Sequence, residues 1–103
     1  MVKVLVKRLN SKVKLPEYKT SGSSGMDLMA AIESPIKIAP STLELIPTGL
    51  SIAIPEDLEI QIRPRSGLAA KSNIGVLNSP GTIDSDYRGE LKIILFNHGN
   101  KDF

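Results

Sequence analysis

The stretch Leu58-Glu59-Ile60-Gln61-Ile62-Arg63 alternates strictly between apolar side chains and charged or polar ones. Successive side chains of a β-strand point to opposite faces, so this alternation predicts a strand with one buried face. Looser alternation predicts two further strands, at 2–7 and 50–54. Short segments rich in β-branched or large apolar residues predict strands at 36–38, 43–46 and 91–96, and the last is apolar enough to predict burial on both faces.

Turn-forming residues separate these predicted strands at short intervals. The chain has seven prolines and eight glycines, and no stretch has a convincing helical period. Many short strands divided by turn residues are typical of a β-sandwich or barrel. We therefore predict an all-β fold that forms a single domain over residues 1–103.

Composition excludes several classes of function. Thirteen Lys and Arg against eleven Asp and Glu give a net charge of +2, which is too mild to predict a nucleic-acid-coating protein. The chain has no cysteine and a single histidine, His98, so disulfide scaffolds, thiol nucleophiles and zinc sites built on Cys and His clusters are excluded. No apolar stretch is long enough for a membrane span. These features predict a cytoplasmic protein, and we assign His98 to a loop or an interface.

Two segments in the first two thirds of the chain carry side chains suited to phosphate or metal chemistry. Gly25-Met26-Asp27-Leu28 places one carboxylate after a polar loop, where Asp27 either caps a turn or lies near a hydrated cation. Pro64-Arg65-Ser66-Gly67-Leu68-Ala69 follows the best strand. It is either a basic surface turn or a site where a guanidinium, a hydroxyl and backbone N–H groups bind a polyphosphate.

A third segment, Asn78 to Glu90, is dense in turn residues and carboxylates and contains Tyr87. One interpretation is a polar hairpin tip. The other is a hairpin that recognises a base, because main-chain groups and the Asn78 amide can match a base-pairing edge while Tyr87 packs against a sugar.

Together the three segments resemble the first three of five signature motifs of the trimeric dUTPase family. The uncommon strings are Pro64-Arg65-Ser66-Gly67-Leu68-Ala69 and Gly81-Thr82-Ile83-Asp84-Ser85-Asp86-Tyr87-Arg88-Gly89, and they occur in the family's order with Gly25-Met26-Asp27-Leu28 before them. The resemblance spans nearly the whole chain. It implies a jelly-roll barrel and hydrolysis of dUTP to dUMP and pyrophosphate.

The resemblance also implies a role for each matching residue. Asp84 would be the general base for water that attacks the α-phosphorus. Asp27 would bind Mg²⁺ through a water, as an outer-shell ligand. Arg65, Ser66 and Gly67 would contact phosphate. Asn78 and the backbone around Ile83 would contact uracil, and Tyr87 would contact deoxyribose. Asp86 would belong to the hairpin turn.

The resemblance further implies a homotrimer whose active sites are shared between subunits. It implies that the fourth and fifth motifs, a phosphate-site segment and a mobile glycine-rich arm, would follow residue 103. Two alternatives stay open at this point. One is a dCTP deaminase-like enzyme, which would use a glutamate to activate water against cytosine; the other is a non-catalytic nucleotide-binding jelly-roll module.

Overall fold

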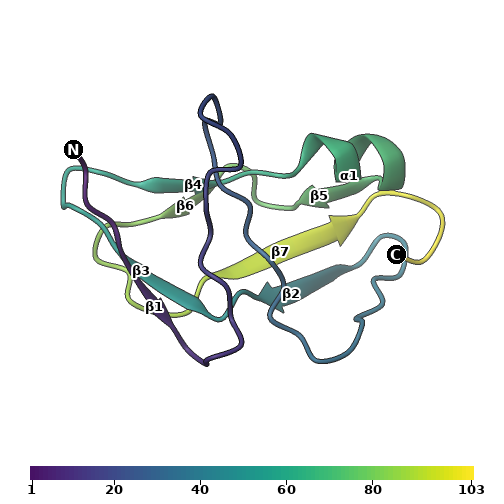
Figure 1. Ribbon diagram of the computed structural model, residues 1–103. Coiled ribbons are helices and arrows are strands. Elements are labelled where there is room, and N and C mark those ends of the chain that lie inside the picture. Colours follow the sequence, from purple (N-terminus) through teal and green to yellow (C-terminus); the bar gives the residue numbers. More distant parts are fainter.

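The structure, a computed structural model, describes residues 1–103, and its regular secondary structure is mostly short antiparallel strands (Figure 1). Strand β1 (Leu5–Arg8) pairs with β3 (Leu50–Ala53). Strand β7 (Lys92–Asn97) lies between β2 (Leu43–Pro47) and β5 (Ile74–Val76) in a three-stranded sheet. A third ladder joins β4 (Ile60–Ile62) to β6 (Gly81–Ile83), and the only helix is α1 (Ser66–Ser72).

The prediction of an all-β fold is confirmed, but its boundaries and closure need correction. The three sheets have two, three and two strands and do not join into a closed barrel. Segment 36–38 is not a strand, although Ile38 exchanges two backbone hydrogen bonds with Phe103, of 2.8 and 3.0 Å. The alternating stretch at 58–63 pairs only over β4, because its partner β6 is three residues long.

Helix α1 was missed because it is two turns long and no side chain in it is buried, so it has no apolar periodicity. Its C-terminus is fixed by Asn73, which adopts a left-handed conformation (φ 57°) and donates its N–H to the carbonyls of Ala69 and Leu68. Strand β7, expected to be buried on both faces, is half-exposed from Ile93 to Phe96, since nothing in this chain covers one of its faces completely.

The core is small and lies where the three-stranded sheet meets the β2–β3 connection. Buried apolar residues come from separate parts of the chain: Val13, Ile38, Ile46, Leu50, Ile74, Val76 and Leu91. Two polar residues are also buried, Thr48 and Asn97. The Asn97 amide donates to the carbonyls of Ile38 (2.9 Å) and Lys101 (2.7 Å), which satisfies both of its N–H groups.

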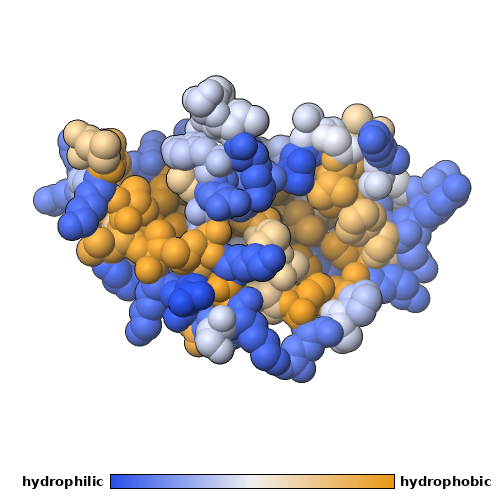
Figure 2. All heavy atoms as spheres, viewed as in Figure 1, coloured by the Kyte–Doolittle hydropathy of each residue, from blue (hydrophilic) through white to orange (hydrophobic).

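Large apolar side chains remain on the surface in unusual number. Figure 2 shows them as broad patches on the face that it displays. They include Leu5 on β1 and both Leu43 and Leu45 on β2, which are 58%, 44% and 54% exposed. Apolar surface of this kind is suited to packing against another polypeptide segment.

Candidate active site

The first two motifs meet in space within one chain. Asp27 lies in a loop without regular structure, and Arg65 ends the extended segment that leads from β4 into α1. The Arg65 guanidinium lies 3.3 Å from the Asp27 carboxylate, with side chains 68% and 40% exposed. Such an exposed ion pair contributes little to stability. Both groups are therefore accessible to a ligand that competes for either charge.

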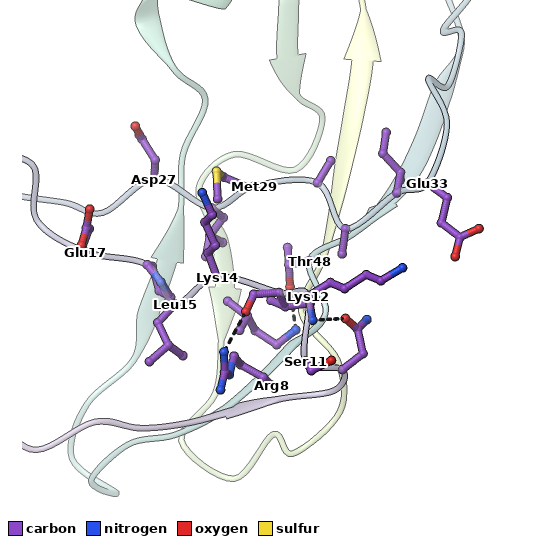
Figure 3. A pocket seen from close by; sticks show the side chains of 18 of the residues that line it. Arg8, Ser11, Lys12, Lys14, Leu15, Glu17, Asp27, Met29, Glu33 and Thr48 are labelled. Atoms are coloured by element: carbon purple, nitrogen blue, oxygen red, sulfur yellow. Dashed lines mark hydrogen bonds between the residues drawn. The ribbon is translucent and has the colours of Figure 1, made fainter.

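Asp27 and Arg65 line an open groove of about 1200 Å³, which we name the Asp27 groove. Figure 3 shows that the basic side chains of Arg8, Lys12 and Lys14 share it with Asp27. Loops without regular structure form most of its walls, so its shape depends on few backbone hydrogen bonds.

Ser66 and Gly67 form the first turn of α1 rather than a simple turn, which corrects the sequence interpretation. The first backbone N–H groups of a helix have no partner within the helix, and here no side chain caps them. No heavy atom lies within 4 Å of the position that a Cβ of Gly67 would take. The backbone at Gly67 is thus open to a bound group.

The third motif is a strand followed by a tight turn, and the expected two-stranded hairpin does not form. Strand β6 pairs with β4, while β7 pairs with β2 and β5. After β6 the chain reverses through a turn in which the Tyr87 N–H donates to the Asp84 carbonyl (3.1 Å). The Arg88 guanidinium donates to the Ser85 carbonyl (2.6 Å) in the same turn.

Ile83, Asp84 and Tyr87 line one small cavity of about 280 Å³, which we name the Asp84 pocket. A carboxylate, an apolar side chain and an aromatic ring therefore face the same space. The other lining residues are Leu45, Thr82, Glu90, Lys92 and Ile94. This volume is at the lower end of small-molecule sites, and it suits one flat ring better than a whole nucleotide.

The Tyr87 ring is held close against its own backbone. Its hydroxyl donates to the Glu90 carbonyl (2.9 Å). A Cβ at Gly89 would lie 2.5 Å from the Tyr87 hydroxyl oxygen, so only glycine leaves room for the ring there. Tyr87 is 44% exposed, which leaves part of the ring free to pack against a ligand.

Asn78 lies outside both cavities. Its amide packs on Gly81, where a Cβ would lie 3.0 Å from the side-chain nitrogen. His98 is also remote from them: its ring lies 4.5 Å from that of Phe96, and its backbone N–H donates to the Asn73 carbonyl. These contacts give His98 a packing role.

The two halves of the site lie at opposite ends of the β4–β6 ladder. Ile83 is opposite Ile60, and the chain runs from there through β4 to Arg65 (Figure 1). Five residues of extended chain correspond to roughly 15 Å. No residue lines both the Asp27 groove and the Asp84 pocket. Asp84 and Arg65 of the same chain are therefore not placed to act on one phosphate.

A set of contacts that the sequence did not reveal secures the third motif to the core. Gly49 donates its N–H to the Glu90 carboxylate (3.0 Å), and the Thr48 hydroxyl donates to the Leu91 carbonyl (2.6 Å). Leu91 donates its N–H to the Leu50 carbonyl (2.8 Å). We name these five residues the Thr48–Leu91 junction. The two segments that the junction joins are more than forty residues apart in sequence, and no local sequence pattern predicts their contact.

The charged groups do not form a protein-only metal site. No group of three or more His, Cys, Asp or Glu side chains is placed to hold a metal ion. Glu17 and Glu33 also line the groove, and the Asp27 carboxylate beside Arg65 fits a hydrated ion that is held mainly by a ligand's phosphates, as Mg²⁺ prefers. The structure also contains no helix long and apolar enough to cross a bilayer.

Comparison with known proteins adds the family. The dUTPase family model matches residues 11–103. The chain belongs to the dUTPase family. The deoxyuridine 5'-triphosphate nucleotidohydrolase of Treponema denticola is 60% identical over 96 residues, which are 93% of this chain and 67% of that protein. The corresponding protein of Rickettsia bellii is 61% identical over 104 residues, covering 100% of this chain and 69% of that one.

Solved dUTPase structures share the fold. The dUTPase of Staphylococcus bacteriophage 80alpha superposes with a TM-score of 0.81 at 26% identity, over 95% of this chain and 61% of that one. A dUTPase mutant from phage phi11 of S. aureus gives a TM-score of 0.82 at 25% identity, again over 95% and 61%, and is described as coordinating a structural Mg(II) ion. This chain thus spans less than two thirds of the phage chains. The fold is that of a dUTPase domain, in agreement with the sequence prediction.

Proposed function

We propose that the complete protein hydrolyses dUTP to dUMP and pyrophosphate, with Asp84 as the general base. The observation that carries this proposal is the Asp84 pocket, where a carboxylate faces the same space as Tyr87 and Ile83. The dUTPase family membership supplies the substrate. A related dUTPase, a mutant of the phage 80alpha enzyme, has been solved with dUpNHpp. We also propose a cytoplasmic location, which fits a chain without cysteine.

In the proposed reaction the Asp84 carboxylate accepts a proton from a water as the water oxygen forms a bond to the α-phosphorus. The bond from the α-phosphorus to the bridging oxygen breaks, and pyrophosphate leaves. A positioned base contributes about 10²- to 10⁴-fold to such a step. The remaining acceleration comes from alignment and from neutralisation of phosphate charge, for which Arg65 supplies a guanidinium.

The proposed substrate contacts come from residues of the two cavities and from Asn78, Ser66 and Gly67, which line neither of them. The exposed part of the Tyr87 ring packs beneath the deoxyribose and leaves no room for a 2′-hydroxyl. Backbone groups around Ile83 bind the uracil edge, and Asn78 contributes an amide from the segment that leads into β6. Ser66 and Gly67 offer backbone N–H groups of α1 to the phosphates.

Mg²⁺ bound to the triphosphate would neutralise its charge and fix the geometry of the phosphates. Asp27 is the residue suited to hold it, as an acceptor from a metal-bound water. The pairing of Asp27 with Arg65 fits this role, because a guanidinium aligns the carboxylate beside the phosphate-binding turn.

We further propose a homotrimer in which the Asp84 pocket of one subunit faces the Asp27 groove of another. Two observations support it: the backbone from Ile60, which is opposite Ile83, to Arg65 corresponds to roughly 15 Å of extended chain, and no residue lines both cavities. A small β-domain has little room for a closed nucleotide site, and a cyclic assembly creates clefts between chains.

The activity is tested by measuring pyrophosphate release from dUTP, UTP, dTTP and dCTP with Mg²⁺, using the complete protein. We expect turnover of dUTP and little of the other three. Comparable turnover of UTP would contradict the assigned role of Tyr87. Deamination of dCTP would favour the deaminase-like alternative, and binding without turnover would favour a non-catalytic module.

The shared site is tested by mixing two inactive variants, Asp84→Asn and Arg65→Ala, after reversible dissociation. If each site combines one chain's Asp84 with another chain's Arg65, an equal mixture restores roughly a quarter of the sites. A double variant carrying both changes is the matched control, because its mixture with either single variant has at most one intact half in each site. No recovery of activity in the equal mixture would show that each chain holds a complete site.

A further inference from the structure

We propose that Glu90 is a positioning residue, which holds the Asp84–Tyr87 turn in place by binding the Gly49 N–H and thereby sets the preference for the 2′-deoxy sugar. This inference rests on the proposed function for its kinetic consequence. Glu90 lines the Asp84 pocket together with Asp84 and Tyr87. This positioning role requires no direct contact between Glu90 and the substrate.

The backbone of Gly49 is held in one conformation by the core. Its backbone has φ of +69°, and a Cβ there would lie 2.5 Å from the Val13 Cγ2. Both Gly49 and Val13 are buried. Any other residue would be strained and would also clash, so the direction of the Gly49 N–H is defined by the core.

Glu90 connects Gly49 to the Asp84–Tyr87 turn. Its carboxylate accepts the Gly49 N–H (3.0 Å), while its carbonyl accepts the Tyr87 hydroxyl (2.9 Å). One residue therefore binds the core through its side chain and the aromatic ring through its backbone. The Glu90 side chain is half-buried, so this charge-assisted bond is only partly screened by water.

Bonds outside the turn fix the chain on both of its sides, since Ile83 is paired in the β4–β6 ladder and Leu91 is bound to the core. Leu91 is 1% exposed and binds Thr48 and Leu50 through its backbone. Between these two points the turn is held by its own local bonds, including Tyr87 N–H to Asp84 carbonyl. The Glu90 carboxylate adds a side-chain link from the turn to the core.

The experiment compares Glu90→Ala and Glu90→Gln in the complete protein, with Glu56→Ala as the matched control. Gln keeps an oxygen that accepts the Gly49 N–H, whereas Ala keeps none. Glu56 lies exposed in the connection between β3 and β4. We expect Glu90→Ala to lower the ratio of kcat/KM for dUTP over UTP by about tenfold, mainly through KM for dUTP. Glu90→Gln and Glu56→Ala should remain within about twofold of the parent.

Amide hydrogen exchange gives a second readout that does not depend on activity. Glu90→Ala should speed exchange at Gly49 and at Tyr87, and Glu90→Gln should keep both protected. If Glu90→Ala does not fold, Glu90→Asp replaces it, because a carboxylate shorter by one methylene does not reach Gly49 in the same backbone position.

The outcomes separate this inference from the proposed function. Unchanged sugar preference in a folded Glu90→Ala or Glu90→Asp protein overturns the positioning role. An equal fall in kcat for both nucleotides that Glu90→Gln does not restore also overturns the positioning role. That result would mean that Glu90 acts only through its charge or through the stability of the fold. If the parent protein does not hydrolyse dUTP, the proposed function is wrong. Amide hydrogen exchange at Tyr87 then still tests whether Glu90 holds the turn.

Discussion

The Asp84 pocket and the Asp27 groove differ in how the fold supports them. The Thr48–Leu91 junction borders both cavities, since Glu90 lines the pocket and Thr48 and Leu50 line the groove, but most other residues of the pocket lie on strands β2, β6 and β7. The groove is formed mostly by loops, and its one side-chain link between motifs is an exposed ion pair. The fold therefore preorganises the half that holds the proposed base and the proposed sugar contact. The half that would bind phosphate and metal depends on its ligand or on another subunit for order.

Removing the base should have the largest effect and tests the rigid half directly. Asp84→Asn should lower kcat for dUTP by about 10²- to 10⁴-fold with little change in KM, because the amide keeps the shape of the carboxylate and loses only its basicity. Steady-state kinetics with dUTP and Mg²⁺ measure this. A kcat close to that of the parent protein would exclude Asp84 as the base.

The next effect concerns the stability of the Thr48–Leu91 junction. Gly49→Ala should lower the free energy of unfolding by about 2–4 kcal/mol, since it adds left-handed backbone strain to overpacking against Val13. Gly22→Ala is the matched control, because no atom lies within 4 Å of a Cβ at Gly22. Denaturant unfolding of both variants checks the difference. Equal stability of the two would mean that the junction tolerates a shift of Gly49.

Thr48→Val should have a smaller effect on stability. The change keeps the side-chain shape but removes the hydroxyl that donates to the Leu91 carbonyl and accepts the Leu50 N–H (3.3 Å). Loss of a buried hydrogen-bond partner costs about 1–3 kcal/mol. Thr42→Val, whose exposed hydroxyl binds the Ala39 carbonyl, is the control and should cost less. Thermal unfolding measures the stability of both variants. A larger loss of stability in Thr42→Val than in Thr48→Val would show that the junction hydrogen bond contributes no more than an exposed one.

The smallest effect on stability is expected in the groove. Asp27→Asn should change the free energy of unfolding by less than about 1 kcal/mol, because its partner Arg65 is exposed and the pair is screened by solvent. Its proposed role predicts instead a higher Mg²⁺ concentration for half-maximal activity. Titration of activity with Mg²⁺ measures this alongside chemical unfolding. A large loss of stability would contradict the contrast between the two halves.

The fold class, the family and the candidate site residues could be predicted from the sequence alone. Alternation at 58–63 predicted strand β4, and the strings around Asp27, Arg65 and Asp84 predicted a dUTPase. These features are local, so a strand period or a motif can be read from neighbouring residues. Helix α1 could not be predicted in this way because it buries no side chain and has no apolar stripe.

Which of these residues meet is set by the tertiary structure. It paired Asp27 with Arg65, separated both from Asp84 along the β4–β6 ladder, and left Asn78 packed on Gly81 outside the pocket. It also joined Glu90 to Gly49, two residues whose link has no signature in either segment. The physical reason is that strand register and buried hydrogen bonds between distant segments depend on how the whole chain packs, which no short stretch of sequence specifies.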